Sequence, residues 1–380
     1  MAIMSTERIF MQRALFLAAL GKGRTSPNPM VGAVLVKQGR VLGEGYHRRA
    51  GEDHAEVIAL RQAGDRASGA TLYVTLEPCS HYGRTPPCTD QIIQTGIQRV
   101  VASMADPNPL VLGGGFERLR QAGIRVETGL MEEASRTLNE AYIKFITTGL
   151  PFVILKGATS LDGKIATVTG ESRWITGPPA RERVHRLRNE VDAVMVGIST
   201  ILKDDPRLTT RLPCGVGKDP LRIVLDSHAQ LPLDARVINP SSSARTLLIT
   251  SSSSPQEKRE DLQKRGVEVW CMELEEGSGK IPLRPLLKRL AEWNVMSLMI
   301  EGGSELNASA LQEGIVDKVV LFLAPRLIGG ATALSWIGGA GVRELRESYS
   351  LKKVSLERMG DDIMFSGYFW PSGGIPCSPD

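Results

Sequence analysis

The sequence predicts an α/β protein with two domains. Segments typical of strands alternate with segments typical of helices along nearly the whole chain, which is the pattern of α/β proteins. The chain has 380 residues, too many for one typical domain and enough for two hydrophobic cores. Gly149, Leu150 and Pro151 interrupt the alternation and favour a hinge. We therefore expect domains at residues 1–149 and 150–370, followed by a disordered tail at 371–380.

The first domain begins with an expected amphipathic helix from about Thr6 to Leu20, ended by Gly21. A turn and a strand follow in "SPNPMVGAVLV", and "KQGRVLGEGYH" predicts the returning strand of a hairpin. Further strands are indicated by "ATLYVTLEP" and "QRVVASMADP". Helices are expected in "HAEVIALRQAG", "CTDQIIQTG" and "EEASRTLNEAYIKFITTG".

In the second domain the alternation starts again. Short apolar runs bounded by polar or glycine residues are typical of buried strands, and they occur in "FVILKGATS", "DAVMVGIS", "RIVLDS", "TLLITS", "SLMIEGG" and "KVVLFLAP". "ARERVHRLRNE" predicts a helix, and another is expected after Gly302 and Gly303. Asp162 and Gly163 are interpreted as a hairpin turn.

Composition and charge narrow the functional classes. The chain is 42% hydrophobic and 23% charged, as soluble globular proteins are, and its net charge of +4 suits a phosphorylated substrate without requiring a nucleic-acid partner. No apolar run approaches the roughly 20 residues of a bilayer span, and no signal-peptide cleavage site follows the first helix. The five cysteines are scattered, so we expect no disulfide framework and a reducing, cytoplasmic location without a membrane partner.

One group of residues indicates metal chemistry. His54, Glu56, Cys79 and Cys88 partly match the H-x-E and P-C-x-x-C pattern of zinc nucleobase deaminases, although the cysteines are nine positions apart instead of three. One imidazole and two thiolates can hold zinc tetrahedrally and leave the fourth position to water. Glu56 can then move the proton of that water to the departing ammonia.

Two other interpretations of this group stay open on the residues alone. The histidine and the cysteines could be unrelated core residues, or they could form a structural zinc site with His47 or His81 as fourth ligand. The acid placed two positions after His54 favours the catalytic interpretation.

The stretches "SPNPMVGAVLV", "HAE" and "EPCSHYGRTPPC" closely resemble the deaminase half of the bifunctional riboflavin-biosynthesis deaminase/reductases. In that family the nine-position step is normal. The resemblance implies a cytidine-deaminase-like three-layer α/β/α domain, zinc on His54, Cys79 and Cys88, and Glu56 as the proton shuttle. It also implies that Asn28 meets the pyrimidine ring, although a plain turn role between two prolines is equally compatible with the local sequence.

The second domain lacks the G-x-G-x-x-G loop of common dinucleotide sites, and the Gly302–Gly303 turn before a helix is only a weak phosphate signal. However, "KGATSLDGKIA", "GESRWITG", "DDPRLTTR" and "EGGSELNAS" resemble, in order, the reductase half of the same family, which implies a dihydrofolate-reductase-like fold and NADPH. The resemblance implies that NADPH contacts Ala158, Trp174, Thr200, Asp204, Ser227, Gly303, Ser304, Glu305, Leu306, Asn307, Ala308 and Ser309. It implies that the substrate contacts Lys156, Ser172, Arg188, Leu208, Arg211 and Glu301.

Local chemistry supports part of this assignment. Arg188 and Arg211 offer planar guanidinium groups suited to a phosphate, and Glu301 can accept hydrogen bonds from a ring amine or a sugar hydroxyl. Lys156 and Asp204 are candidates for orienting or protonating the sugar. Arg188 could instead be a solvated helix charge and Trp174 a core residue. Arg207 stands among these residues where we expect a smaller side chain.

The resulting hypothesis is one polypeptide with two consecutive activities. The first domain deaminates a phosphoribosylamino-diaminopyrimidinone with zinc, and the second reduces the ribosyl chain of the product with NADPH. We expect a small phosphorylated substrate and a homo-oligomer. Two rivals are a tRNA-type deaminase, which predicts a C-x-x-C pair, a basic stripe and no reductase half, and a non-catalytic zinc-binding regulator.

Overall fold

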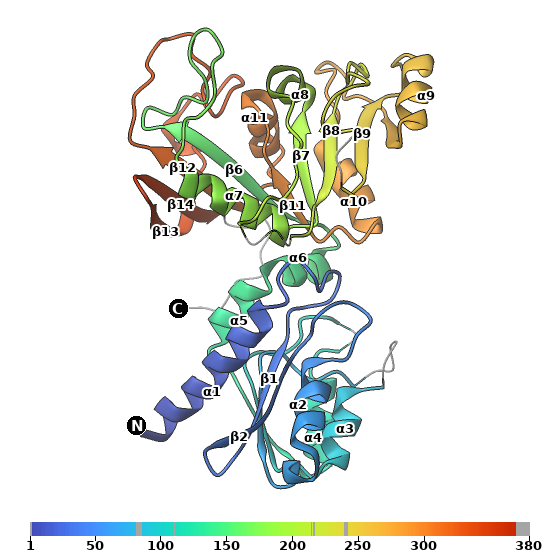
Figure 1. Ribbon diagram of the computed structural model, residues 1–380, viewed down its shortest axis with the longest axis vertical. Helices are drawn as coiled ribbons and strands as arrows, with labels where there is room; N and C mark the ends of the chain where they lie inside the picture. The colour runs from blue at the N-terminus through green and yellow to red at the C-terminus, as the bar shows by residue number, and fades with distance from the viewer. Residues whose placement is uncertain are drawn as a thin grey trace. The chain divides into compact units, whose positions relative to one another are not determined.

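The computed structural model describes residues 2–80, 86–109, 111–213, 215, 217–238 and 242–369 (Figure 1). The chain divides into two compact units, Met1–Leu150 and Pro151–Asp380, and each is described by itself. The tail expected at 371–380 lies outside the described residues. Among the helices that are described, none has both the length and the apolar character needed to cross a membrane.

The described part of the first unit contains a five-stranded sheet in the order β2-β1-β3-β4-β5. β1 pairs antiparallel with β2, which confirms the expected hairpin, and antiparallel with β3. β3, β4 and β5 run parallel to one another. The strands are β1 (Gly32–Lys37), β2 (Arg40–Tyr46), β3 (Thr71–Val74), β4 (Arg99–Ala102) and β5 (Arg125–Thr128).

Helices cover both faces of this sheet and make the predicted three layers. α2 (Ala55–Ala63), α3 (Cys88–Gln94) and α4 (Gly114–Gln121) lie on one face, and α1 (Ala2–Ala19) and α5 (Glu132–Leu138) lie on the other (Figure 1). The alternation of side chains along β1 separates the two cores, because successive residues point to opposite faces. Leu35 packs with the first group of helices, and Val34 packs with α1.

Two glycines in β2 bring the sheet close to α2. A Cβ atom on Gly43 would lie 2.1 Å from the carbonyl oxygen of Ala59, and one on Gly45 would lie 2.3 Å from that of Ala55. Only glycine permits so close a contact between a strand and a helix backbone. The first turn of α2, which follows His54, is therefore held directly against the sheet.

The segment 132–149 does not form one helix, so that prediction is wrong. α5 ends at Leu138, and a second helix, α6 (Glu140–Thr148), begins after Asn139. The Asn139 amide accepts a hydrogen bond from the backbone N–H of Met30 at 2.8 Å and donates one to the Met30 carbonyl at 3.0 Å. This contact with a residue 109 positions away accompanies the break in the helix.

The described part of the second unit contains a nine-stranded sheet in the order β10-β9-β8-β7-β11-β6-β12-β14-β13. The strands from β10 to β12 in this order are parallel, and β14 and β13 continue the sheet antiparallel. The strands are β6 (Phe152–Ser160), β7 (Ala193–Gly197), β8 (Leu221–Leu225), β9 (Thr246–Ser251), β10 (Val267–Met272), β11 (Ser297–Ile300), β12 (Lys318–Ala324), β13 (Leu351–Met359) and β14 (Asp362–Phe369).

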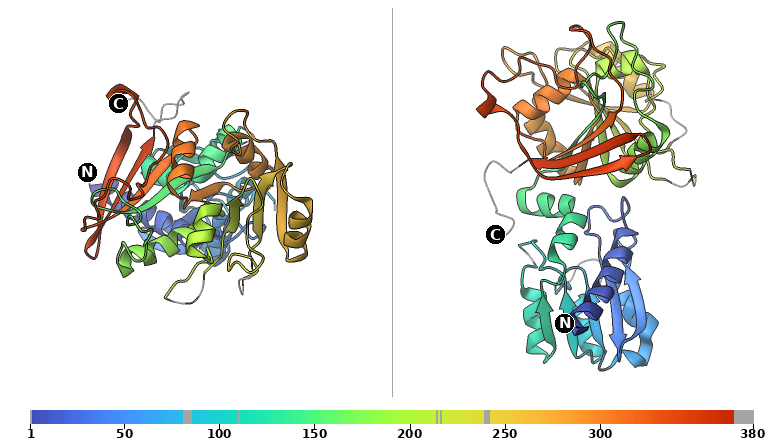
Figure 2. Two further views of the ribbon diagram at one scale, coloured as in Figure 1. Left: turned by 90° about the horizontal axis from the view of Figure 1, so that it is seen from above. Right: turned by 90° about the vertical axis from the view of Figure 1, so that its left-hand side faces the viewer.

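The helices of this unit are α7 (Pro178–Glu190), α8 (Ile198–Asp204), α9 (Gln256–Lys264), α10 (Leu283–Glu292) and α11 (Ser304–Gln312). The hairpin of β13 and β14, which is red in Figure 2, was not predicted from the sequence. Most residues of β13 are exposed, so the strand has no buried face to produce an alternating pattern. A turn at Asp162 and Gly163 follows β6 as expected, but it does not join a hairpin, because β6 pairs in parallel with β11 and β12.

Candidate functional site

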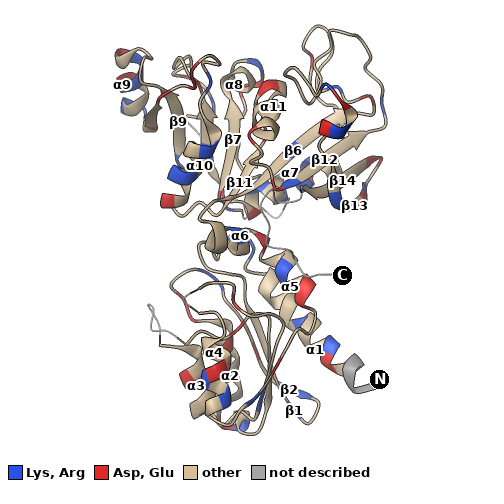
Figure 3. Cartoon of the chain, turned by 180° about the vertical axis from the view of Figure 1, so that it is seen from behind, with Lys and Arg blue, Asp and Glu red and all other residues tan. Residues whose placement is uncertain are grey.

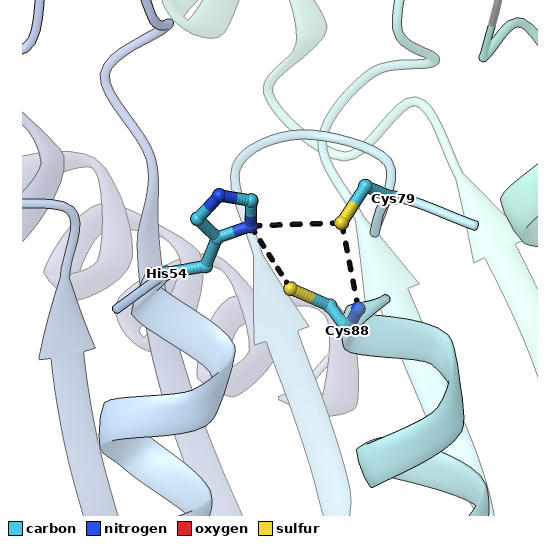
Figure 4. Close-up of side chains that lie close together, drawn as sticks. All are labelled: His54, Cys79 and Cys88. Atoms are coloured by element: carbon cyan, nitrogen blue, oxygen red, sulfur yellow. Dashed lines mark hydrogen bonds between the residues drawn. The ribbon is translucent and has the colours of Figure 1, made fainter. Parts of the chain in front are cut away.

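Three separate segments of the first unit bring together the three predicted metal ligands (Figure 4). His54 immediately precedes α2, Cys79 follows β3, and Cys88 is the first residue of α3. The His54 Nδ1 atom lies 3.1 Å from the Cys88 Sγ atom and 3.6 Å from the Cys79 Sγ atom. All three ligand atoms lie within 4.8 Å of one another.

The chemistry of this donor set fits zinc, which binds imidazole nitrogen and thiolate sulfur. The Cys79 thiol has its pKa lowered to about 4, first by its hydrogen bond with Cys88 and then, against burial, by His54. The backbone N–H of Cys88 also points to the Cys79 sulfur, at 3.4 Å. Cys79 is therefore held in an environment that favours the thiolate, the form that binds metals.

Glu56 lies beside this group without belonging to it. The residue is in the first turn of α2, its exposed fraction is 3%, and burial raises the pKa of its carboxyl group despite the opposing charge of His54. Its Oε2 atom is buried and has no hydrogen-bond partner within the described structure. A buried carboxyl with a free oxygen next to a metal site can accept and return a proton.

His47 is not a fourth ligand, so this alternative is wrong. Its Nδ1 atom lies 3.2 Å from the Asp53 carbonyl oxygen, and its Nε2 atom lies 3.0 Å from the Asn28 side-chain nitrogen. Because a carbonyl only accepts, Nδ1 carries the proton and Nε2 accepts from the Asn28 amide. Both ring nitrogens are thus engaged, while His81 lies outside the described residues.

Asn28 has both a local and a site-directed role in the structure. Its backbone N–H donates to the Thr25 carbonyl at 2.7 Å, as a turn residue does. Its side chain reaches His47, whose ring packs edge-on against that of His54 at 5.3 Å between centroids. Asn28 therefore lies one side chain away from the metal-ligand group.

A cavity of about 1280 Å³ lies in the second unit. Polar groups reach it from the carboxyl ends of several parallel strands, where ligands bind in open α/β sheets. Most of the residues predicted for this unit line it: Lys156, Ala158, Ser172, Trp174, Arg188, Thr200, Asp204, Leu208, Arg211, Ser227, Glu301, Gly303, Ser304, Glu305, Leu306 and Ser309. Asn307 and Ala308 do not line it, and both are buried.

Three charged side chains meet at one side of the cavity. Arg188 binds both carboxylate oxygens of Glu301, at 2.6 and 2.9 Å, and Lys156 Nζ lies 3.5 Å from Glu301 Oε2. Burial by itself would raise the pKa of Glu301, but the charges of Arg188 and Lys156 together lower it to about 2. Burial also lowers the pKa of Lys156, against the attraction of Glu301.

This arrangement corrects two interpretations of Arg188. Its guanidinium faces the Glu301 carboxylate, so it does not offer a free planar group to a phosphate. It is not a solvated helix charge either, because only 11% of its side chain is exposed. Arg188 instead fixes the position of Glu301.

Arg211 remains available to an anion at the same cavity. The residue is exposed, and its guanidinium bonds the Thr209 hydroxyl at 2.8 Å. Arg207 and Arg236 also line the cavity, so cationic groups gather there. His185 stays neutral among them, since burial first and then Arg188 and Arg211 lower its pKa to about 4.

Trp174 and Asp204 lie where the cavity meets solvent. Trp174 is 62% exposed, so its interpretation as a core residue is wrong, and the Arg181 guanidinium lies 4.6 Å from the centre of its ring. Asp204 accepts a hydrogen bond from the Ser172 hydroxyl at 3.1 Å. A large exposed aromatic face beside a cavity is suited to stacking on a planar ligand.

Sequence reasoning missed several polar residues of the cavity. Lys280, for example, donates a hydrogen bond to Ser309 at 3.1 Å from a connecting segment with no recognisable motif. Such residues come from loops and helix faces, and only folding brings them to the cavity. The missed polar and aromatic residues include His185, Lys203, Arg236, Lys280 and Trp336.

Comparison with known proteins assigns each unit. Residues 4–104 match the family described as the cytidine and deoxycytidylate deaminase zinc-binding region, and residues 151–365 match the RibD C-terminal domain. Riboflavin biosynthesis protein RibD of Aquifex aeolicus is 47% identical over 362 residues, covering 95% of this chain and 98% of that protein. The chain belongs to the RibD family. RibD of Escherichia coli is 42% identical, covering 94% of this chain and 98% of that protein.

Solved structures of RibD proteins share the fold of the whole chain. Acinetobacter baumannii RibD has a TM-score of 0.86 and 38% identity, covering 97% of this chain and 99% of its own. A Thermotoga maritima protein described as a diaminohydroxyphosphoribosylaminopyrimidine deaminase and 5-amino-6-(5-phosphoribosylamino)uracil reductase has a TM-score of 0.84 and 37% identity, with the same coverage. These RibD structures confirm the predicted α/β fold class.

Proposed function

We propose that this chain is a bifunctional enzyme of riboflavin biosynthesis. Its first unit deaminates 2,5-diamino-6-(5-phosphoribosylamino)pyrimidin-4(3H)-one and releases ammonia. Its second unit reduces the ribosyl chain of the product to 5-amino-6-(5-phosphoribitylamino)uracil with NADPH. The proposal depends on two features in one chain of the RibD family. They are the His54, Cys79 and Cys88 group beside Glu56, and the large cavity that contains the Glu301 charge cluster.

In the first unit, His54, Cys79 and Cys88 would hold zinc with three protein ligands, the number typical of catalytic sites. When bound, zinc supplies a Lewis acid that makes a water molecule reactive near neutral pH. Glu56 would take a proton from the attacking water and deliver it to the departing ammonia, because its buried carboxyl has a raised pKa and a free oxygen. Asn28 would contact the pyrimidine.

In the second unit, NADPH when bound supplies the hydride for C1 of the open sugar. The start of α11 would bind it together with the other cavity residues predicted for the cofactor. Lys156 would protonate the sugar oxygen, since burial lowers its pKa and makes it a better acid. Arg211 would bind the phosphate, whereas Arg188 would orient Glu301. Ser172 and Leu208 would complete the substrate pocket.

The test is an assay of the purified protein with zinc, the diaminopyrimidinone and NADPH. We expect ammonia release followed by oxidation of NADPH. Failure of both reactions in zinc-loaded, folded protein would reject the proposal. The E56Q variant addresses the rival zinc-binding regulator, because undiminished deamination with zinc retained would show that Glu56 is not the proton shuttle.

A tRNA-type deaminase is not favoured. The relatives that match over most of the chain are RibD proteins, and the reductase half has no place in that rival. Figure 3 shows acidic and basic residues interspersed along the described chain, whereas this rival predicts a basic stripe. Strong, salt-dependent binding of tRNA would revive this alternative.

We further propose that the enzyme works in the cytoplasm as a homo-oligomer on a small phosphorylated pyrimidine. The free state of Cys79, Cys88 and Cys271 is compatible with a reducing compartment. Light scattering of the purified chain gives the oligomeric state, and a monomer at assay concentrations would contradict that part of the proposal.

A further inference from the structure

Glu77 is a buried acid next to the metal-ligand group that no step described above uses. Its exposed fraction is 3%, and it precedes Pro78 and Cys79. Within the described part of the chain, its carboxylate accepts four hydrogen bonds, each from a backbone N–H group. The donors are Asp106 at 3.2 Å and Gly113 at 3.1 Å on Oε2, and Gly115 at 2.9 Å and Phe116 at 3.1 Å on Oε1.

Two of these donors, Asp106 and Gly113, lie in the connection between β4 and α4, and the other two, Gly115 and Phe116, lie in the first turn of α4. The four N–H groups face a single carboxylate, so its charge also lies at the positive end of the α4 dipole. The backbone N–H of Glu77 also donates a hydrogen bond to the carbonyl of Met104, which follows β4, at 3.0 Å. The Glu77 side chain thus fixes the contact between the start of α4 and the segment after β3 that carries Cys79.

The contact is close as well as polar. A Cβ atom on Gly115 would lie 2.0 Å from the Pro78 carbonyl oxygen, and one on Gly114 would lie 3.3 Å from the Ser80 hydroxyl. The start of α4 therefore packs directly on the segment that carries Cys79, without room for a side chain. On its other side, Cys79 is tied to α3 through the Thr89 N–H, which donates to its carbonyl at 3.2 Å.

We propose that Glu77 is a positioning residue of the deaminase site, which holds the Cys79 segment against α4 and so presents the Cys79 sulfur to His54 and Cys88. This inference rests on the proposed deaminase function. Metal ligation depends on residues outside the ligand set that fix the ligands, and their loss commonly costs 10- to 100-fold in metal affinity or activity. Glu77 is such a residue, because its hydrogen bonds to backbone N–H groups hold the segment that carries Cys79.

The test compares E77Q with the matched control E127Q. In E77Q an amide nitrogen replaces one oxygen and faces two N–H donors, so two of the four bonds are lost. Glu127 belongs to the same unit but pairs with Arg99 on β4. We expect E77Q to bind zinc at least tenfold more weakly than wild type in competition with a chelator, and E127Q to bind it normally. The two amides that face the new side-chain nitrogen, either those of Gly115 and Phe116 or those of Asp106 and Gly113, should also exchange hydrogen faster, and only in E77Q.

Activity separates positioning from simple stabilisation. At saturating zinc we expect the deaminase kcat of E77Q to fall at least tenfold, while NADPH oxidation with deaminated substrate stays unchanged and reports intact second units. Normal zinc affinity and normal kcat in E77Q, with only a lower Tm, would overturn the inference.

If the first unit of E77Q does not fold, G115A tests the same contact with the carboxylate retained. The added methyl group pushes α4 from the Pro78 oxygen, so weaker zinc binding is expected again, and normal binding would overturn the inference. A wild-type protein that binds zinc but releases no ammonia would instead reject the proposed function, and the zinc measurements would still decide the role of Glu77.

Discussion

Replacement of Arg188 by methionine should destabilise the second unit strongly. The guanidinium and the Glu301 carboxylate are 11% and 7% exposed and make two hydrogen bonds. Removal of one partner from such a buried pair typically costs 3–5 kcal/mol, because the other charge stays buried. We therefore expect R188M to lose roughly 3–5 kcal/mol of unfolding free energy.

Urea unfolding followed by tryptophan fluorescence measures this loss selectively, because all five tryptophans lie after residue 150. R186M is the matched control on the same helix. Arg186 pairs with Glu182 at 2.6 Å, but 59% of its side chain is exposed, so its loss should cost about 0.5 kcal/mol or less. A loss below about 1 kcal/mol for R188M, or one equal to that of R186M, would refute the reasoning about the buried charge.

Three further predictions follow from the two sites. The E56Q variant should retain zinc, as measured by metal analysis, and lose at least 100-fold in ammonia release, since only its proton transfer is removed; a smaller loss would contradict that role. The pKa of Glu301 is lowered in the folded state, so its stabilising contribution should be complete above pH 4.5 and disappear as the pH falls towards about 2. Urea midpoints of the second unit should show this loss in wild type but not in E301Q, and parallel curves would argue against it. The N139A variant, which removes the partners of the half-buried backbone groups of Met30, should lower stability by about 1–3 kcal/mol and raise the deaminase KM. Thermal unfolding and kinetics test this, and unchanged values for both would reject the contact as important.

The local sequence was sufficient to predict those parts of the metal-ligand site that lie at the starts of helices and the ends of strands. The stretches "HAEVIALRQAG" and "CTDQIIQTG" predict α2 and α3, so both ligands could be placed at helix N-termini. The residue types then specify the metal chemistry. The three atoms meet because β3 delivers Cys79 between these two helices.

Contacts between distant segments could not be read from the sequence. The break at Asn139 depends on Met30, and the pairing of Arg188 depends on Glu301, 113 positions away. The sequence around Arg188 does not show whether its guanidinium binds a carboxylate, a phosphate or solvent. The hairpin of β13 and β14 was missed for another reason, because β13 is mostly exposed and carries no burial pattern.

Each half of the polypeptide has a separate β-sheet and a separate set of chemically active groups. A mutation that inactivates the site of one unit should therefore leave the site of the other unit active. Consider a cell with two copies of the gene, one mutated at Glu56 and the other at Lys156. It should still make 5-amino-6-(5-phosphoribitylamino)uracil if the deaminated intermediate passes from one protein molecule to another. Genetic complementation between two individually dead alleles would then be an expected trait of this gene.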